Sequence, residues 1–262
     1  MNAILTMSSF IFPLLTFPYV TRILTPVGTG RVAFATSLVS YFNKFAQLGI
    51  PTYGIRECAK VRDSKIELTR TVHELLFINL MMAVLAYILL ALALIFVPRL
   101  QADRTLYVIV SLTIVLQAIG LEWLYKALEQ YTYIMVRSIV FKFIALVCMF
   151  ALIHEQKDYV IYGAITILAA SASNVLNLIN VHKYIGLKPV GGYRPLRHMK
   201  AVMVFFAMAC ATTIYTNLDT IMLGFMTSDA ETGYYDAAVK IKRILVSVVT
   251  SLGTVLLPRV SY

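Results

Sequence analysis

Apolar segments long enough to cross a membrane recur along the whole sequence. The longest uninterrupted one, residues 75–97, carries no charged side chain, and a transmembrane helix needs about 20 such residues. The chain is 60% hydrophobic and 14% charged, whereas soluble domains have about 25% charged residues. A membrane β-barrel would instead show alternating segments of about ten residues. The sequence therefore predicts an all-α polytopic membrane protein.

We expect about eight transmembrane helices. Six would form a complete N-terminal lobe, residues 1–196, and two would begin an incomplete C-terminal lobe, residues 197–262. The boundary falls in a basic connector at residues 182–200 that is rich in proline and glycine, residues that favour loops. The expected spans are residues 3–23, 32–55, 75–97, 106–125, 134–153, 159–181, 202–226 and a last one that begins near residue 233.

A short internal repeat supports the division into two lobes. Gly30 is followed five residues later by Ala35, and Gly233 is followed five residues later by Ala238. Each glycine opens the second expected helix of its lobe, which is the arrangement of parallel repeats in many transporters. The second repeat holds only its first two helices, so we expect the chain to be a truncated product or a partial reading frame.

The basic residues of the loops indicate the orientation. Linkers after the second, fourth and sixth expected spans hold most of the loop lysines and arginines, and linkers after the odd-numbered spans hold few. Positive loops stay on the cytoplasmic side, so the N-terminus is expected there. The net charge of +10 therefore reflects membrane topology, and no nucleic-acid partner is expected. No cleavable signal peptide is expected either, because the first apolar segment has no cationic leader.

Lys44 stands near the middle of the expected span 32–55. Ser37, Ser40, Tyr41 and Gln47 lie at helical spacing from it, on the same face. A charge at membrane depth costs roughly 3 kcal/mol, so such a lysine either extends to the interface or faces a polar cavity. Its central position favours the cavity.

Further polar residues point to the same cavity. The last expected span carries Asp236, Lys240, Arg243 and Ser247 at steps of four, three and four residues, a single stripe along one helix face. Lys142, about two turns inside the fifth span, either lines the cavity or extends to the interface. Asn177, in the sixth span, either lines the cavity or bonds a neighbouring helix. A surplus of lysine and arginine favours an anionic cargo, and phosphate groups are usual partners of these cations.

Acidic residues in the last two spans are candidates for ion coupling or gating. Asp219 and Asp236 lie in the seventh and eighth expected spans. Asp219 would pair with Lys240 or Arg243 in one state and release it when cargo or a proton arrives. Structural ion pairing is the simpler alternative.

Signals of enzymatic chemistry are missing from the sequence. There is no glycine-rich loop of the ATP-hydrolysing type, and His73-Glu74 lacks the second histidine of a zinc-protease helix because position 77 is Phe77. The three cysteines and four histidines are scattered, so we expect no metal and no cofactor. Trp123 and Tyr125, at the end of the fourth span, are interpreted as part of the aromatic belt at the membrane interface.

Several motifs resemble the flippases of bacterial O-antigen and capsule repeat units. FPYVTRIL at residues 17–24, followed by Gly28 and Gly30, is similar to the opening signature of that family. LGIPTYGIRE at residues 48–57 resembles its second-helix exit, and EWLY at residues 122–125 its fourth-helix motif. NLDTIMLG at residues 217–224 and GYY at residues 233–235 resemble the start of its second lobe.

This resemblance implies the fold of multidrug, oligosaccharidyl-lipid and polysaccharide exporters, with two six-helix lobes around a central cavity. It implies a multi-pass protein of the bacterial inner membrane that moves undecaprenyl-pyrophosphate-linked oligosaccharide between leaflets by alternating access, with polysaccharide polymerase machinery as a further partner. The implied protein is not an enzyme. Members of that family have more spans than this chain, so the eight expected here would not close the second lobe.

Three alternatives stay open. A cation-coupled multidrug exporter of the same fold would need an acidic cavity for cationic drugs, and the surplus of basic residues disfavours it. A membrane polysaccharide polymerase would need a large outer loop for its catalytic groups, and the expected outer loops are short. A non-catalytic scaffold would have no reason for the polar stripe in the last span.

Overall fold

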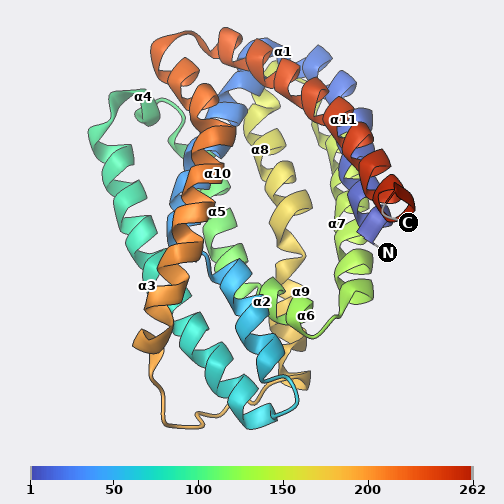
Figure 1. Cartoon of the computed structure of the whole chain (residues 1–262). Helices are drawn as coiled ribbons and strands as arrows, with labels where there is room; N and C mark the ends of the chain where they lie inside the picture. Colours follow the sequence, from blue (N-terminus) through green and yellow to red (C-terminus); the bar gives the residue numbers. More distant parts are fainter. Residues whose placement is uncertain (1, 261–262) are drawn as a thin grey trace.

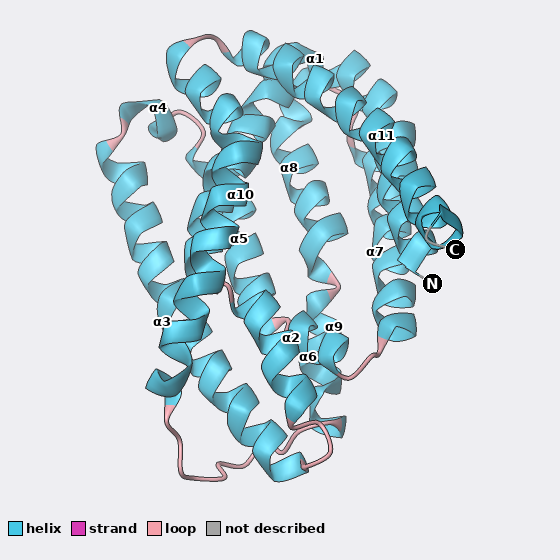
Figure 2. Ribbon diagram, in the orientation of Figure 1, coloured by secondary structure: helices cyan, strands magenta, loops and turns pink. Residues whose placement is uncertain are grey.

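The chain folds as a bundle of helices, seen in a computed structural model (Figure 1). The structure describes residues 2–260, and the side chains of residues 16–243, 245 and 246. It is 87% helical, and the described residues contain no strand (Figure 2). The expected all-α fold class is confirmed.

The first two expected helices join directly at a sharp kink, and together they form α1 (Asn2–Gln47). α1 runs through the predicted loop at residues 25–30 and leaves helical geometry at Thr25, with φ 58° and ψ 171°. Pro26 explains the kink, because a residue before proline is pushed out of the helical region while proline itself fits a first helical turn. The predicted turn between two helices is therefore confirmed at Thr25, whereas residues 26–30 are helical and not loop.

The expected helix over residues 32–55 is also wrong, because it is broken after α1. Leu48 and Gly49 have positive φ angles of 44° and 74°, and α2 (Ile50–Lys60) then begins with Pro51 in its first turn. Glycine adopts the left-handed conformation at little cost, and Pro51 has no backbone N–H to continue the helix. Lys44 consequently lies in the last turn of α1, not at the centre of a span.

The third helix exposes large apolar side chains along one face. α3 (Lys65–Phe96) begins after its N-cap Ser64, and α4 (Pro98–Gln101) follows it directly. Phe77 and Val84 of α3 are 60% and 61% exposed. Large apolar side chains exposed along one face indicate contact with an apolar surrounding rather than with water.

The fourth expected helix is divided into α5 (Arg104–Ile119) and α6 (Glu122–Ala127). Leu121, between them, has a φ of 45°, a conformation that few residues other than glycine adopt. Trp123 and Tyr125 are buried, 4% and 0% exposed. The interpretation of these aromatics as an interfacial belt is wrong, because the turn at Leu121 directs α6 into the bundle.

The next two expected helices are present, one of them irregular. α7 (Tyr131–Leu152) is continuous. The sixth consists of α8 (Tyr159–Ile167), a π-helical stretch η2 (Leu168–Ala172), and α9 (Asn174–Asn180). A π turn inserts extra chain into a helix and often marks a functional site.

The connector and the last two helices complete the chain. Two short 3₁₀ segments lie near the two ends of the basic connector: η3 (Val181–Lys183) and η4 (Pro195–His198). α10 (Met199–Met226) and α11 (Asp229–Val260) follow, and both pack against α1. The boundary between lobes at residues 196 and 197 stays a prediction, with α10 beginning next to it.

Four helical stretches are long and apolar enough to cross a membrane: Lys65–Phe96, Tyr131–Leu152, Gln156–Lys183 and Pro195–Met226. A fifth, Arg104–Ile119, is apolar but shorter. The protein is thus a multi-pass membrane protein, and the full set of eight spans stays a prediction. In Figure 1 the turns beside α4 and between α10 and α11 lie at the upper end of the bundle, and the turn between α2 and α3 and the basic connector lie at the lower end.

Candidate functional site

The largest group of predicted site residues surrounds a cavity of 370 Å³ between α1, α8, α10 and α11, which we name the Lys240 cavity. Asp236, Lys240 and Arg243 line it together from one face of α11, as the stripe in the sequence indicated. Hydroxyl and amide side chains supply most of the remaining polar lining: Thr16, Thr29, Thr36, Ser37, Tyr162, Thr166, Asn217 and Thr220.

Lys240 is held in this cavity by several contacts. Its Nζ atom lies 2.6 Å from Oδ2 of Asp236, one helical turn away, and donates to the Tyr162 hydroxyl at 3.5 Å. It also lies 5.7 Å from the ring centre of Phe17 and 5.9 Å from that of Tyr162, within cation–π range. Arg243 lines the same cavity with an exposed side chain. Two cations and one carboxylate leave a positive surplus.

A second cavity, of 320 Å³, adjoins the first, and we name it the Lys44 cavity. Thr36 and Thr166 line both cavities. Lys44 is half-buried in the lining. The three predicted cations Lys44, Lys240 and Arg243 therefore lie along neighbouring hollows.

A third cavity, of 270 Å³, continues the row, and we name it the Trp123 cavity. It shares Gln117 and Ala170 with the Lys44 cavity. Between these two cavities, Gln117 Oε1 accepts hydrogen bonds from Asn43 Nδ2, at 2.9 Å, and from Gln47 Nε2. The shared residues place the three cavities in sequence, the first lined partly by α10 and α11, the third by the helices of the expected N-terminal lobe.

The remaining predicted residues lie elsewhere. Asn177 donates to the Gly120 carbonyl at 2.5 Å and is fully buried, so its side chain joins α9 to α5 outside the lining of these cavities. Lys142 is half-buried on α7 and is not part of the lining of the three cavities among the described residues. The side chain of Ser247 lies outside the described residues.

Asp219 has a partner that differs from the expected ones. It is an exposed residue of α10 and accepts a 2.6 Å hydrogen bond from the Tyr235 hydroxyl. Lys240, its expected partner, pairs with Asp236 instead. Asn217 and Thr220, which flank Asp219, line the Lys240 cavity, so Asp219 lies next to that cavity.

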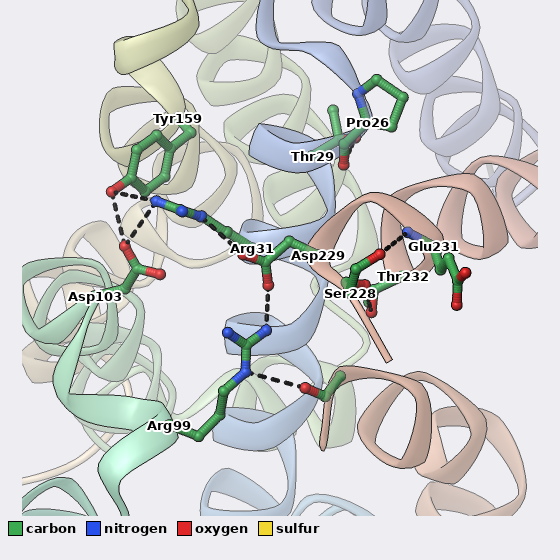
Figure 3. Close-up of polar contacts among 11 residues, drawn as sticks. Pro26, Thr29, Arg31, Arg99, Asp103, Tyr159, Ser228, Asp229, Glu231 and Thr232 are labelled. Carbon is green, nitrogen blue, oxygen red and sulfur yellow. Dashed lines mark hydrogen bonds and ion pairs between the residues drawn. The ribbon is translucent and has the colours of Figure 1, made fainter. Parts of the chain in front are cut away.

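Sequence reasoning missed a network of charges at the upper end, which we name the upper cluster: Arg31, Arg99, Asp103, Tyr159 and Asp229 (Figure 3). Arg31 Nε lies 3.0 Å from Asp229 Oδ2, and Arg31 Nη1 lies 3.5 Å from Asp103 Oδ1. Tyr159 donates to Asp103 Oδ1 at 2.7 Å. Arg99 pairs with the other oxygen of Asp229 and donates to the Gly224 carbonyl at 3.1 Å.

The upper cluster lies where α1 and α11 cross most closely. A Cβ atom on Gly30 would come within 1.8 Å of the Asp229 carbonyl oxygen, and one on Gly233 within 1.9 Å of the Pro26 carbonyl oxygen. The two glycines that open the repeat in the sequence are thus packed against each other's helix. The equivalent positions of the two glycines in the sequence repeat were a signal for this crossing. The repeat gave no signal for their charged neighbours Arg31 and Asp229.

A second missed network lies at the lower end, which we name the lower cluster: Tyr53, Glu74, Arg197 and His198. Nε2 of His198 lies 2.7 Å from Glu74 Oε2, and its Nδ1 lies 2.7 Å from the Tyr53 hydroxyl. Arg197 Nη2 lies 2.8 Å from the same Glu74 oxygen, and the Arg194 amide donates to Glu74 Oε1 at 2.6 Å. Glu74 thus fastens the connector before α10 to α3.

Comparisons with known proteins agree with the geometry. The sequence profile of the family described as "Polysaccharide biosynthesis protein" matches residues 1–262. A protein of Escherichia coli (strain K12), named as a proposed O-antigen transporter, is 24% identical over 261 residues, 99% of this chain and 63% of that protein.

A protein of Shigella dysenteriae with the same name is 22% identical over 256 residues, 97% of this chain and 64% of that protein. The chain therefore spans less than two thirds of the length of these curated relatives. No solved structure matches it at a significant level.

Proposed function

Because the chain belongs to the polysaccharide biosynthesis protein family, we propose that it is part of a flippase for undecaprenyl-pyrophosphate-linked oligosaccharide repeat units. The flippase would carry them from the inner to the outer leaflet of the bacterial inner membrane for O-antigen or capsule synthesis. The two relatives named as transporters support transport rather than an enzymatic reaction. The single observation that carries the proposal is the row of cavities lined by Lys240, Arg243 and Lys44.

The Lys240 cavity suits a pyrophosphate group. Lysine and arginine donors form short, charge-assisted hydrogen bonds to phosphate oxygens, and cations inside a membrane protein mark the path of a charged substrate. Lys240 has Asp236 as its resting partner at 2.6 Å. An arriving pyrophosphate would compete with this carboxylate for the ammonium group, while Arg243 offers a planar second contact.

The upper cluster is the proposed outer gate of alternating access. If the N-terminus is cytoplasmic, as the basic loops at the lower end indicate, the upper end faces the periplasm. Arg31 of the proposed N-terminal lobe (1–196) pairs there with Asp229 of the proposed C-terminal lobe (197–262) at 3.0 Å. Opening the gate would break this pair and separate the crossing of α1 and α11.

Asp219 and Asp236 are the proposed residues for ion coupling or gating. Asp236 neutralises Lys240 between transport events, and Asp219 is positioned by Tyr235 next to the cavity. We keep Lys142, Asn177 and Ser247 as proposed cavity residues of other conformations, because rocking of one lobe against the other changes which side chains face the cavity. Polymerase machinery in the membrane stays a proposed partner.

The binding test uses the purified chain in lipid nanodiscs and farnesyl pyrophosphate as the probe. We expect Lys240→Ala and Arg243→Ala each to weaken binding about tenfold, the value of one charge-assisted contact. Lys157→Ala, which removes an exposed lysine at the upper end, is the control and should bind as the unchanged chain does. Equal binding by all variants would remove the charged-cavity mechanism.

The cellular test places substitutions of the cavity cations in the gene at its native locus. Lys44→Ala and Arg243→Ala should abolish surface polysaccharide with normal levels of the protein in the membrane. A multidrug exporter would instead change resistance to cationic drugs with surface polysaccharide intact. A polymerase would leave single repeat units on the outer leaflet when inactivated, whereas a flippase would leave them on the inner leaflet.

A further inference from the structure

The Trp123 cavity differs in chemistry from the other two hollows. Amide side chains from three helices and one ion pair surround a single indole ring: Gln47, Gln117, Glu122, Trp123, Lys126 and Asn174. Glu122 and Lys126 form an ion pair at 2.7 Å, so the charged side chains of this lining balance. The Lys240 cavity, in contrast, has a positive surplus.

Two polar groups in this part of the row have no protein partner among the described residues. The indole Nε1 of Trp123 is buried without a hydrogen-bond acceptor. The hydroxyl Oγ1 of Thr113, a residue of the adjoining Lys44 cavity, is also buried without a hydrogen-bond partner. Trp123 is 4% exposed. A buried polar group without a hydrogen bond is costly, and native structures rarely keep one without a reason. Both atoms are enclosed by protein, so a ligand in these hollows would contact the amides and the ion pair of the lining instead.

The polar side chains of the Trp123 cavity are held in place by their neighbours. Arg137, buried to 2% exposure, contacts Glu122 Oε2 at 3.0 Å and donates to Asn174 Oδ1 at 2.8 Å. The Trp123 ring packs directly over Gly54, where a Cβ atom would lie 2.7 Å from the ring. A site whose groups are fixed before binding loses less entropy when the ligand arrives.

We propose that the Trp123 cavity is a sugar-binding subsite, which receives a residue of the glycan while the cations of the row hold the pyrophosphate. Sugar rings present hydroxyl groups that both donate and accept, and apolar C–H faces that pack on an aromatic ring. The amides and the carboxylate of the lining match the hydroxyl groups, and the indole ring of Trp123 matches an apolar face. The balanced charges of the lining disfavour a second phosphate. This inference depends on the proposed function for the origin of the glycan.

Trp123 makes the subsite directly observable, because it is the only tryptophan of the chain. The probe is a panel of free sugars, galactose, rhamnose, glucose and N-acetylglucosamine, each titrated into the purified chain in nanodiscs. At least one sugar should change the tryptophan emission in a saturable manner. Glycerol, titrated in the same way, should not.

Variants connect the emission change to the cavity. Gln117→Ala and Asn174→Ala should each weaken sugar binding about tenfold, the value of one or two hydrogen bonds. Gln101→Ala, at the exposed last residue of α4, is the matched control and should leave binding unchanged. An emission spectrum equal to that of the unchanged chain before titration shows that each variant keeps Trp123 buried and therefore folds.

The outcomes separate this inference from the proposed function. Binding of farnesyl pyrophosphate without a response to any sugar of the panel would overturn the subsite and leave the flippase proposal intact. A saturable sugar response without pyrophosphate binding would keep the subsite and overturn the cationic anchor. Sugar binding that Gln117→Ala and Asn174→Ala leave unchanged would also overturn the subsite, since the sugar would then bind elsewhere.

Discussion

The upper and lower clusters are both networks of charged side chains, yet they are built differently. In the upper cluster Arg31 is 34% exposed and Asp229 15%, and Asp229 has two arginine partners. In the lower cluster Glu74 is 0% exposed and His198 2%. Pairs that water reaches contribute less to stability and exchange partners more easily than buried pairs, whereas a buried charge that loses its partner is strongly destabilising. The upper network is therefore suited to open and close, and the lower one to fasten the connector permanently.

The largest effect on stability is expected for a substitution in the lower cluster. Glu74→Ala removes the acceptor of His198, Arg197 and the Arg194 amide, and should lower the free energy of unfolding by about 3 kcal/mol. A denaturant titration of the chain in detergent measures it. Glu67→Ala, whose side chain is 45% exposed in its pair with Arg70, is the control and should cost less than about 1 kcal/mol. Equal losses in the two variants would contradict the contrast between the clusters.

The next effect is at the helix crossing beneath the upper cluster. Gly30→Ala places a methyl group within 1.8 Å of the Asp229 carbonyl, so α1 and α11 must move apart, at a cost of about 1–3 kcal/mol. We expect loss of surface polysaccharide in cells with normal protein levels. Gly186→Ala is the matched control, because its Cβ would meet its nearest atom at an ordinary 3.8 Å. Normal surface polysaccharide in the Gly30 variant would show that the close crossing is not needed.

A substitution at Asp229 is expected to have the smallest effect on stability. It should have a clear effect on how easily the Lys240 cavity is reached from the outer side. Asp229→Asn weakens both arginine contacts and should cost less than about 1 kcal/mol. In a cysteine-free background with Asn217→Cys as a reporter in the Lys240 cavity, labelling by an impermeant maleimide from the outer side should become several-fold faster. Glu231→Gln, an exposed residue of the same helical turn, should label at the original rate. An unchanged rate in the Asp229 variant would assign the upper cluster to structure alone.

The sequence predicted well what depends on local periodicity. The helical class, the long apolar helices and the common face of Asp236, Lys240 and Arg243 all follow from spacing along one helix. Interruptions of the helices were harder to predict. Leu121, for example, adopts a positive φ of 45° although it is not glycine. The break at Gly49 and Pro51 had a local signal, but the apolar run through it suggested a single span.

What the sequence could not show depends on long-range contacts. Arg31 and Asp229 are 198 residues apart, and Glu74 and His198 are 124 apart. No spacing rule connects such pairs, so the sequence alone does not bring these side chains together. Trp123 was misplaced for the same reason: only the packed bundle shows that α6 turns inward.

The π-helical stretch η2 has a consequence for the cavities on either side of it. Each residue of an α-helix turns the chain about 100° around the helix axis. The extra chain taken up at Leu168–Ala172 therefore rotates the side chains of α9 relative to those of α8. Tyr162 and Thr166 above the irregular turn line the Lys240 cavity, and Asn174 below it lines the Trp123 cavity. Deleting one residue there would turn Asn174 away from its present neighbours without removing any side chain named above. One irregular helical turn thus sets the alignment between the proposed pyrophosphate end and the proposed sugar end of a single cargo.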